Sequence, residues 1–212
     1  MRTASLKPGA PASRPTMVDA RRFYERLYRK HGNSPLALGW SEEGQRRRFE
    51  VLAEVGDLQG ADVLDLGCGL GHMCDFLQKR ALTVSYRGVD VLPRIVAEAR
   101  RLHPGVPFEV VDAIHGPLPW DADFVFVSGV LNLETGDNEA DMRRMLGAAF
   151  GACHRATAVN MLSTWADRYD RGRHYYDPGR ALRSARRLTR WVVLRHDYMP
   201  HDFTLYMYRK KP

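Results

Sequence analysis

The chain has 212 residues, a net charge of +7, and 44% hydrophobic and 27% charged residues, which suits one globular domain with a sizeable core. No apolar run approaches the roughly 18 residues of a membrane span, and no basic start precedes an apolar signal core. We therefore expect a cytoplasmic protein without a membrane partner. Its three cysteines lack zinc-like spacing, so we expect reduced thiols and no metal site.

The positive charge is unevenly placed along the chain. Residues 161–212 carry 12 basic and 5 acidic side chains, whereas residues 61–160 carry 9 and 13. A basic end can serve nucleic acid, an anionic small substrate, or only a solvated surface. The aromatic residues form no base-stacking pattern with the arginines, so nucleic acid is the least favoured of the three.

The first 60 residues predict a tail followed by a helical cap. Residues 1–16 are rich in Pro, Ala and Ser and lack acidic side chains, which is typical of disorder. A helical spacing of apolar residues runs from Asp19 to a cluster of turn formers at 31–35. A second helix is expected from Ser41, so we assign residues 17–60 to an N-terminal helical cap.

From residue 61 onward the pattern alternates between strand and helix. We expect strands at 63–66, 86–91, 108–111, 124–127, 156–161, 191–194 and 203–208, and helices at 71–80, 93–102, 138–153 and 177–188. This order predicts one α/β domain over 61–212, with a mostly parallel sheet and a late antiparallel strand. We expect a short connection between the last two strands, and it contains His196 and Asp197.

A glycine-rich turn follows the first strand and has acidic partners further on. Gly67 and Gly69 allow a sharp turn and leave room for a ligand against the main chain. Asp90, at the end of the second strand, can accept both hydroxyls of a ribose. Asp112, at the end of the third strand, is placed to accept a hydrogen bond from an adenine amino group.

The same turn differs from the G-x-G-x-x-G pattern of NAD- and FAD-binding proteins. His72 stands where that pattern has its third glycine, and Asp65 lies inside the preceding strand. The pattern D-x-G-x-G-x-G with two later acids therefore favours a different nucleoside ligand.

These segments identify a family resemblance over residues 60–212. Residues 63–71, 88–91, 110–113 and 123–132 resemble the first four motifs of class I S-adenosylmethionine-dependent methyltransferases, and 193–204 is similar to a subset of small bacterial members. The resemblance implies a Rossmann-like seven-stranded sheet with helices on both faces, S-adenosylmethionine as cofactor and S-adenosylhomocysteine as product. The implied cofactor contacts are Asp65, Gly67, Cys68, Gly69, Asp90, Val91, Asp112, Ala113, Ser128 and Gly129.

Acceptor chemistry is expected beyond the carboxyl ends of the strands. This rule selects Asn132 after the fourth strand and His196 with Asp197 after the sixth. Histidine titrates near neutrality, so His196 is the candidate general base, with Asp197 or Asp202 orienting it. A His-Asp pair in a strand connection is equally a common structural feature, and a base is needed only when the acceptor must lose a proton.

Candidate substrate-contacting residues are aromatic or histidine, and each has core packing as its alternative. They are Tyr24, Tyr28, His31, Trp40, Trp165, Tyr175 and Tyr176. The last two lie in a long connection, 162–178, a kind of loop that often carries function. Its arginines, Arg168, Arg171 and Arg173, either hold a carboxylate or phosphate or face solvent.

The sequence thus predicts an enzyme that methylates an O or N of a small molecule, with an anionic acceptor as one option. RNA- or protein-directed methylation and a non-catalytic cofactor-binding role are the alternatives. Ser128-Gly129-Val130-Leu131 stands where base-methylating relatives carry Asn/Asp-Pro-Pro-aromatic, so a nucleic-acid partner is disfavoured. A cap of about 60 residues also suits a small acceptor.

Overall fold

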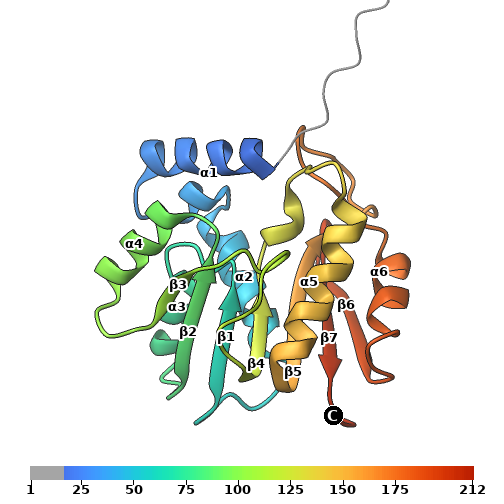
Figure 1. Ribbon diagram of the computed structural model, residues 1–212. Coiled ribbons are helices and arrows are strands. Elements are labelled where there is room, and N and C mark those ends of the chain that lie inside the picture. Colours follow the sequence, from blue (N-terminus) through green and yellow to red (C-terminus); the bar gives the residue numbers. More distant parts are fainter. Residues whose placement is uncertain (1–16) are drawn as a thin grey trace, which may run out of the picture.

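A seven-stranded sheet organises residues 17–212, the part of the chain that this computed structural model describes; the predicted tail at 1–16 lies outside the described residues. The strands are β1 (Asp62–Leu66), β2 (Ser85–Asp90), β3 (Phe108–Val110), β4 (Ala122–Val127), β5 (Cys153–Leu162), β6 (Val192–Met199) and β7 (Asp202–Tyr208). Their order is β3-β2-β1-β4-β5-β7-β6, and β7 runs antiparallel to both of its neighbours (Figure 1). The predicted mostly parallel sheet with a reversed last strand is confirmed.

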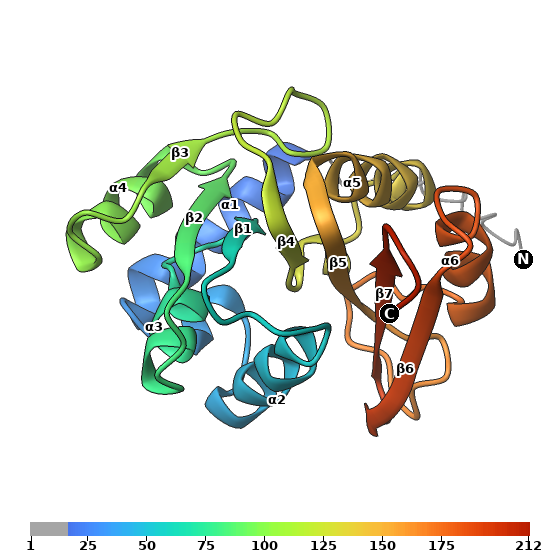
Figure 2. The same cartoon turned by 90° about the horizontal axis from the view of Figure 1, so that it is seen from below.

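Helices cover both faces of this sheet. They are α2 (Glu42–Ala53), α3 (His72–Lys79), α4 (Pro93–Leu102), α5 (Asn138–Ala152) and α6 (Pro178–Ala185). The first three pack into one apolar cluster with Phe124 and Phe126, whereas α5 and α6 pack into the other with Val125 and Val127 (Figure 2). Alternate residues of β4 therefore enter opposite clusters, which explains its continuous apolar run.

The N-terminal helices occupy two different places. Helix α1 (Met17–His31) and the short helix η1 (Pro35–Leu38) lie across one end of the sheet, whereas α2 packs on its face with Val51 and Leu52 buried (Figure 1). A predicted division near residue 60 stays a prediction. Across residues 17–212, no helix has both the length and the apolar character of a membrane span.

The predicted end of the sixth strand was wrong. β6 continues to Met199, so His196 and Asp197 lie within the strand and only residues 200–201 form the turn. The register with β7 is irregular between Arg195 and Met199. Such an irregularity lets a strand carry poor strand formers, and cross-strand pairing outweighs their low intrinsic propensity.

Candidate active site

The glycine turn after β1 is tied to the end of β2. The backbone N–H groups of Gly67 and Cys68 both donate to the carbonyl of Val89, at 2.8 and 3.0 Å. Gly67 has φ +77°, and a Cβ there would lie 2.2 Å from Cγ2 of Val130. Only glycine fits this close approach. The turn therefore leaves bare main chain at the carboxyl end of the sheet.

Asp90 is held firmly at the tip of β2. Its two carboxylate oxygens accept hydrogen bonds from the N–H groups of Gly69 and Leu92, both at 3.0 Å. Burial raises the pKa of Asp90, and these backbone bonds oppose the rise. Each oxygen has a further lone pair, so the fixed carboxylate can also accept from ligand hydroxyls.

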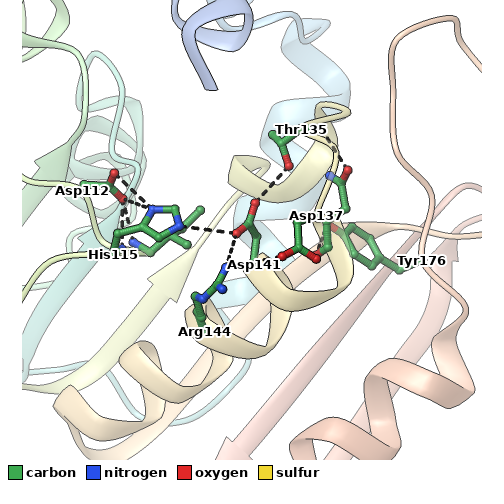
Figure 3. A network of polar contacts seen from close by, with 9 residues as sticks. Asp112, His115, Thr135, Asp137, Asp141, Arg144 and Tyr176 are labelled. Atoms are coloured by element: carbon green, nitrogen blue, oxygen red, sulfur yellow. Dashed lines mark hydrogen bonds and ion pairs between the residues drawn. The ribbon is translucent and has the colours of Figure 1, made fainter. Parts of the chain in front are cut away.

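A polar network joins the loop after β3 to the start of α5 (Figure 3). Asp112 Oδ1 accepts from the backbone N–H of His115, and the His115 Nδ1 lies 3.3 Å from both Asp112 oxygens. On its other side, His115 Nε2 lies 3.7 Å from Asp141 Oδ1, and Asp141 Oδ2 accepts from the Thr135 hydroxyl at 3.0 Å. His115 therefore bridges two carboxylates on different elements.

A cavity of about 1030 Å³, open to solvent, lies among these loops and beneath α1. Of the residues predicted to contact cofactor or substrate, ten line it: Tyr24, Trp40, Gly67, Gly69, Asp90, Val91, Asp112, Ala113, Ser128 and Gly129. Sequence reasoning missed a second set on α4, α5 and neighbouring loops, including Ile95, Thr135, Asn138, Asp141 and Met145. Helical periodicity predicts that Ile95 is on the buried face of its helix, but it cannot predict that this face borders a cavity.

The remaining two predicted cofactor residues lie beneath the turn. Asp65 is buried, and its Oδ2 accepts a hydrogen bond from the Tyr86 hydroxyl at 2.7 Å. Its Oδ1 has no hydrogen-bond partner among residues 17–212. Burial raises the pKa of Asp65 to about 7, although the Tyr86 hydroxyl opposes the shift. Cys68 is also buried, with its thiol 3.7 Å from the Gly69 carbonyl.

Trp40 closes the cavity against the tip of β4. Gly129 has φ +73°, and a Cβ there would lie 2.4 Å from the Trp40 ring. The N–H of Gly129 donates to Asn160 Oδ1 at 2.8 Å. The Arg48 guanidinium lies 3.9 Å from the centroid of this ring and pairs with the buried Asp202. The indole thus contacts both a glycine and a neutralised cation.

The three predicted catalytic residues lie outside the cavity lining. His196 Nε2 lies 2.7 Å from the Ser163 hydroxyl oxygen. Asp197 accepts from the Arg195 guanidinium at 2.8 and 3.0 Å, with its side chain 64% exposed. Asn132 is fully buried and accepts from a backbone N–H of β5. Their catalytic roles stay predictions.

Five of the seven predicted substrate residues also lie outside the lining. Tyr28 packs near α4, with the Arg94 guanidinium 5.4 Å from its ring, and Trp165 is 60% exposed. Tyr175 stacks on Tyr169 at 4.3 Å, and buried Tyr176 donates to the Leu131 carbonyl at 3.0 Å. His31, the last residue of α1, completes the five. Tyr24 and Trp40 are the two that reach the cavity.

The cavity residues fit an S-adenosyl group. Gly67 and Gly129 both line the cavity with main chain, and Asp90 and Asp112 line it from the ends of two neighbouring strands. Between them the lining is mostly apolar, as a nucleobase and a ribose ring require. Asp90 would hold the ribose, Asp112 would face the adenine, and the turn at 67–69 would lie against the methionine part.

Comparisons with known proteins agree with this geometry. Residues 63–155 match a family model described as a methyltransferase domain. A Mycobacterium tuberculosis protein described as a methyltransferase is 31% identical over 149 residues, which cover 66% of this chain and 89% of that protein.

Two further comparisons show how far the likeness extends. A trans-aconitate 2-methyltransferase of Methylobacterium nodulans is 39% identical over 95 residues, 44% of this chain but only 36% of that enzyme. The fold is similar to magnesium protoporphyrin IX methyltransferase from Synechocystis PCC 6803 with bound S-adenosylmethionine, with a TM-score of 0.67 at 18% identity over 95% of this chain and 100% of that one. With the family model, the Mycobacterium relative and the site in agreement, this chain belongs to the class I S-adenosylmethionine-dependent methyltransferases.

Proposed function

We propose that this protein transfers a methyl group from S-adenosylmethionine to an oxygen or nitrogen of a small-molecule acceptor. One observation carries the proposal: the cavity containing the glycine turn and the two acids is also lined by Tyr24, on α1, and by Trp40, the second residue after η1. A cover made of the chain's own aromatic side chains favours a small enclosed acceptor. We also propose that the protein works in the cytoplasm and without a nucleic-acid partner.

The protein's part in the reaction is to bind, orient and exclude water. When bound, S-adenosylmethionine supplies a methyl group already activated by its sulfonium sulfur. Asp90 and Asp112 would fix the nucleoside end, because each carboxylate is itself held by backbone N–H groups. Trp40 and Tyr24 would exclude water above the transfer position. Positioning of this kind lowers the barrier to an in-line displacement without acid or base chemistry.

The proposal does not require a general base. An ionised oxygen or a neutral amine attacks without first losing a proton. The position of His196 beside Ser163 and outside the cavity lining gives a base role no support. His196→Ala should therefore keep kcat within about threefold of wild type. A loss of a hundredfold or more, with normal cofactor affinity, would instead establish the predicted base.

Calorimetry and a transfer assay test the function. Titration of the purified protein with S-adenosylmethionine and with S-adenosylhomocysteine should release heat with one-to-one stoichiometry. Radiolabelled methyl groups should then reach at least one compound in a panel of small acids, alcohols and amines. Absence of heat with both ligands would overturn cofactor binding, and binding without any labelled product would favour the non-catalytic alternative.

A further inference from the structure

The three arginines of the connection between β5 and α6 have different surroundings. Arg168 and Arg171 are exposed, whereas Arg173 is partly buried beside Phe23 in the middle of α1. Its guanidinium lies 5.3 Å from the Phe23 ring centroid and 6.0 Å from that of Trp40. A Cβ added to Gly39 would meet Arg173 Nη2 at 2.6 Å, so the guanidinium packs directly on that glycine. Arg173 therefore stands against the residues that cover the cavity.

Among the residues whose side chains the structure describes, 22–37 and 39–212, no carboxylate pairs with Arg173. Its Nη1 is buried without a hydrogen-bond partner there, and no ion pair within 4.0 Å joins the guanidinium to an acid of these residues. Arg48, the other arginine beside Trp40, differs from Arg173 because its guanidinium donates two hydrogen bonds to the Asp202 carboxylate. A guanidinium shielded from water needs an anionic partner, and aromatic faces compensate only in part.

Two buried asparagines also have side-chain donors without a partner in the described part of the chain. Of four buried side-chain atoms without a partner in residues 17–212, three are N–H donors: Arg173 Nη1, Asn132 Nδ2 and Asn160 Nδ2. Both amide oxygens are already engaged, by the N–H groups of Leu162 and Gly129, so the donor ends are the free ends. The His174 N–H donates to the Asn132 carbonyl at 3.1 Å, which anchors the Arg173 segment beside β4.

We infer that Arg173 binds a carboxylate group of the acceptor and thereby selects acidic small molecules. The inference rests on the proposed function and names its substrate class. Arg173 is close enough to Tyr24 to oppose the rise that burial gives to the pKa of that phenol, and Tyr24 and Trp40 both line the cavity. Arg173 itself lies outside the lining, so a carboxylate bound to it would sit at the margin of the cavity, next to Tyr24 and Trp40. The planar guanidinium matches a carboxylate in a two-bond arrangement that lysine does not provide.

Binding measurements with matched variants test this inference. Protein saturated with S-adenosylhomocysteine is titrated with benzoate, succinate and citrate, and with dimethyl succinate as an uncharged control. We expect at least one acid to bind wild type and Arg171→Gln equally within twofold, and Arg173→Gln at least 20-fold more weakly. Acids that bind Arg173→Gln as well as wild type, or no binding of any acid to wild type, would overturn the inference. If S-adenosylhomocysteine itself releases no heat on titration, the proposed function fails, and the result does not bear on Arg173.

Thermal unfolding separates a binding role from a structural one. Arg173→Met keeps the apolar stem and removes the unpaired charge, so the ligand-free variant should unfold at the wild-type temperature or above it. The acid that binds should raise the unfolding temperature of wild type and of Arg171→Gln but not of Arg173→Met. A ligand-free Arg173→Met protein that unfolds several degrees lower would identify Arg173 as a packing residue and refute the assignment.

Discussion

At the scale of single residues, Asp90 is the most direct test of the cofactor site. Asp90→Ala removes the carboxylate that would accept from the ribose hydroxyls and frees the N–H groups of Gly69 and Leu92. Hydrogen bonds to a charged group contribute about 1.5–3 kcal/mol, so affinity for S-adenosylhomocysteine should fall roughly 10- to 100-fold. Calorimetry measures this affinity, and Asp121→Ala, at an exposed position, is the control. An affinity within threefold of wild type would remove Asp90 from the site.

Gly129 tests whether the cover closes tightly over the site. Gly129→Ala should weaken S-adenosylhomocysteine binding and lower stability, because the new methyl group would lie 2.4 Å from the Trp40 ring. The matched control is Gly105, where φ is also positive (+86°) but a Cβ would have no neighbour within 4 Å. A substitution there adds backbone strain without crowding. Gly105→Ala should cost only the strain of about 1–2 kcal/mol and leave affinity unchanged. Equal effects of the two substitutions on affinity and stability would count against the close Trp40 contact.

The residues at strand tips could be predicted because the sequence spacing encodes them directly. Gly67 follows β1, Asp90 is the last residue of β2 and Asp112 comes two residues after β3, and parallel strands end at one edge of the sheet. Asp141 could not be predicted in this way. It looks like an ordinary first-turn acid of an amphipathic helix, and only the docking of α5 beside His115 brings it to the cavity.

At the scale of elements, the predicted bounds of a helix or strand are correct where the local sequence preference agrees with the packing of that element in the fold. The helix predicted at 93–102 matches α4 residue for residue, because Pro93 suits a first turn and the apolar period of the helix faces the sheet. The prediction that β6 ends at Leu194 failed because His196, Asp197 and Pro200 are typical of a connection. Pairing with β7 nevertheless extends the strand to Met199. Local sequence cannot reveal a partner strand that supplies the missing hydrogen bonds.

A buried ion pair joins α2 to β7 across 154 residues of sequence. Arg48 Nε donates to Asp202 Oδ1 at 3.1 Å, and both side chains are almost completely buried. Arg48→Met should therefore lower the free energy of unfolding by about 3–5 kcal/mol, because among the described residues the buried Asp202 carboxylate keeps only the His201 ring, with Nε2 3.4 Å from Oδ2. Urea unfolding measures the loss. The double variant Arg48→Met/Asp202→Leu should recover a large part of it, and simple additivity of the two single losses would contradict the pairing argument.

At the scale of the whole molecule, the fold explains why the acceptor side is hard to predict. The cofactor side comes from strand ends, but the cover comes from α1 and Trp40, against which Arg173 of the connection before α6 packs. Phe23 and Arg173 are 150 positions apart in sequence, yet the Arg173 guanidinium lies only 5.3 Å from the Phe23 ring centroid in the folded chain. Their meeting depends on where α1 crosses the end of the sheet, and no periodicity in either segment specifies that crossing.

Stability as a function of pH should reveal the buried Asp65 beneath the glycine turn. Its pKa is about 7 in the folded protein, against an ordinary value of 3.8, so the folded state binds more protons than the unfolded state between these values. Stability should therefore fall as pH rises from about 4 to about 7 and then level off. Three pKa units correspond to at most about 4 kcal/mol.

Asp65→Asn isolates this contribution from other titrating groups. The asparagine amide oxygen can still accept from the Tyr86 hydroxyl, yet it has no charge to desolvate. In urea unfolding, the variant should match wild type near pH 4 and exceed it by about 2–4 kcal/mol at pH 8. Asp90 and Asp202, whose pKa values burial also raises, are common to both proteins and cancel in the difference. Exposed Asp121→Asn should keep the wild-type slope, and a constant difference between Asp65→Asn and wild type at every pH would show that Asp65 is charged throughout.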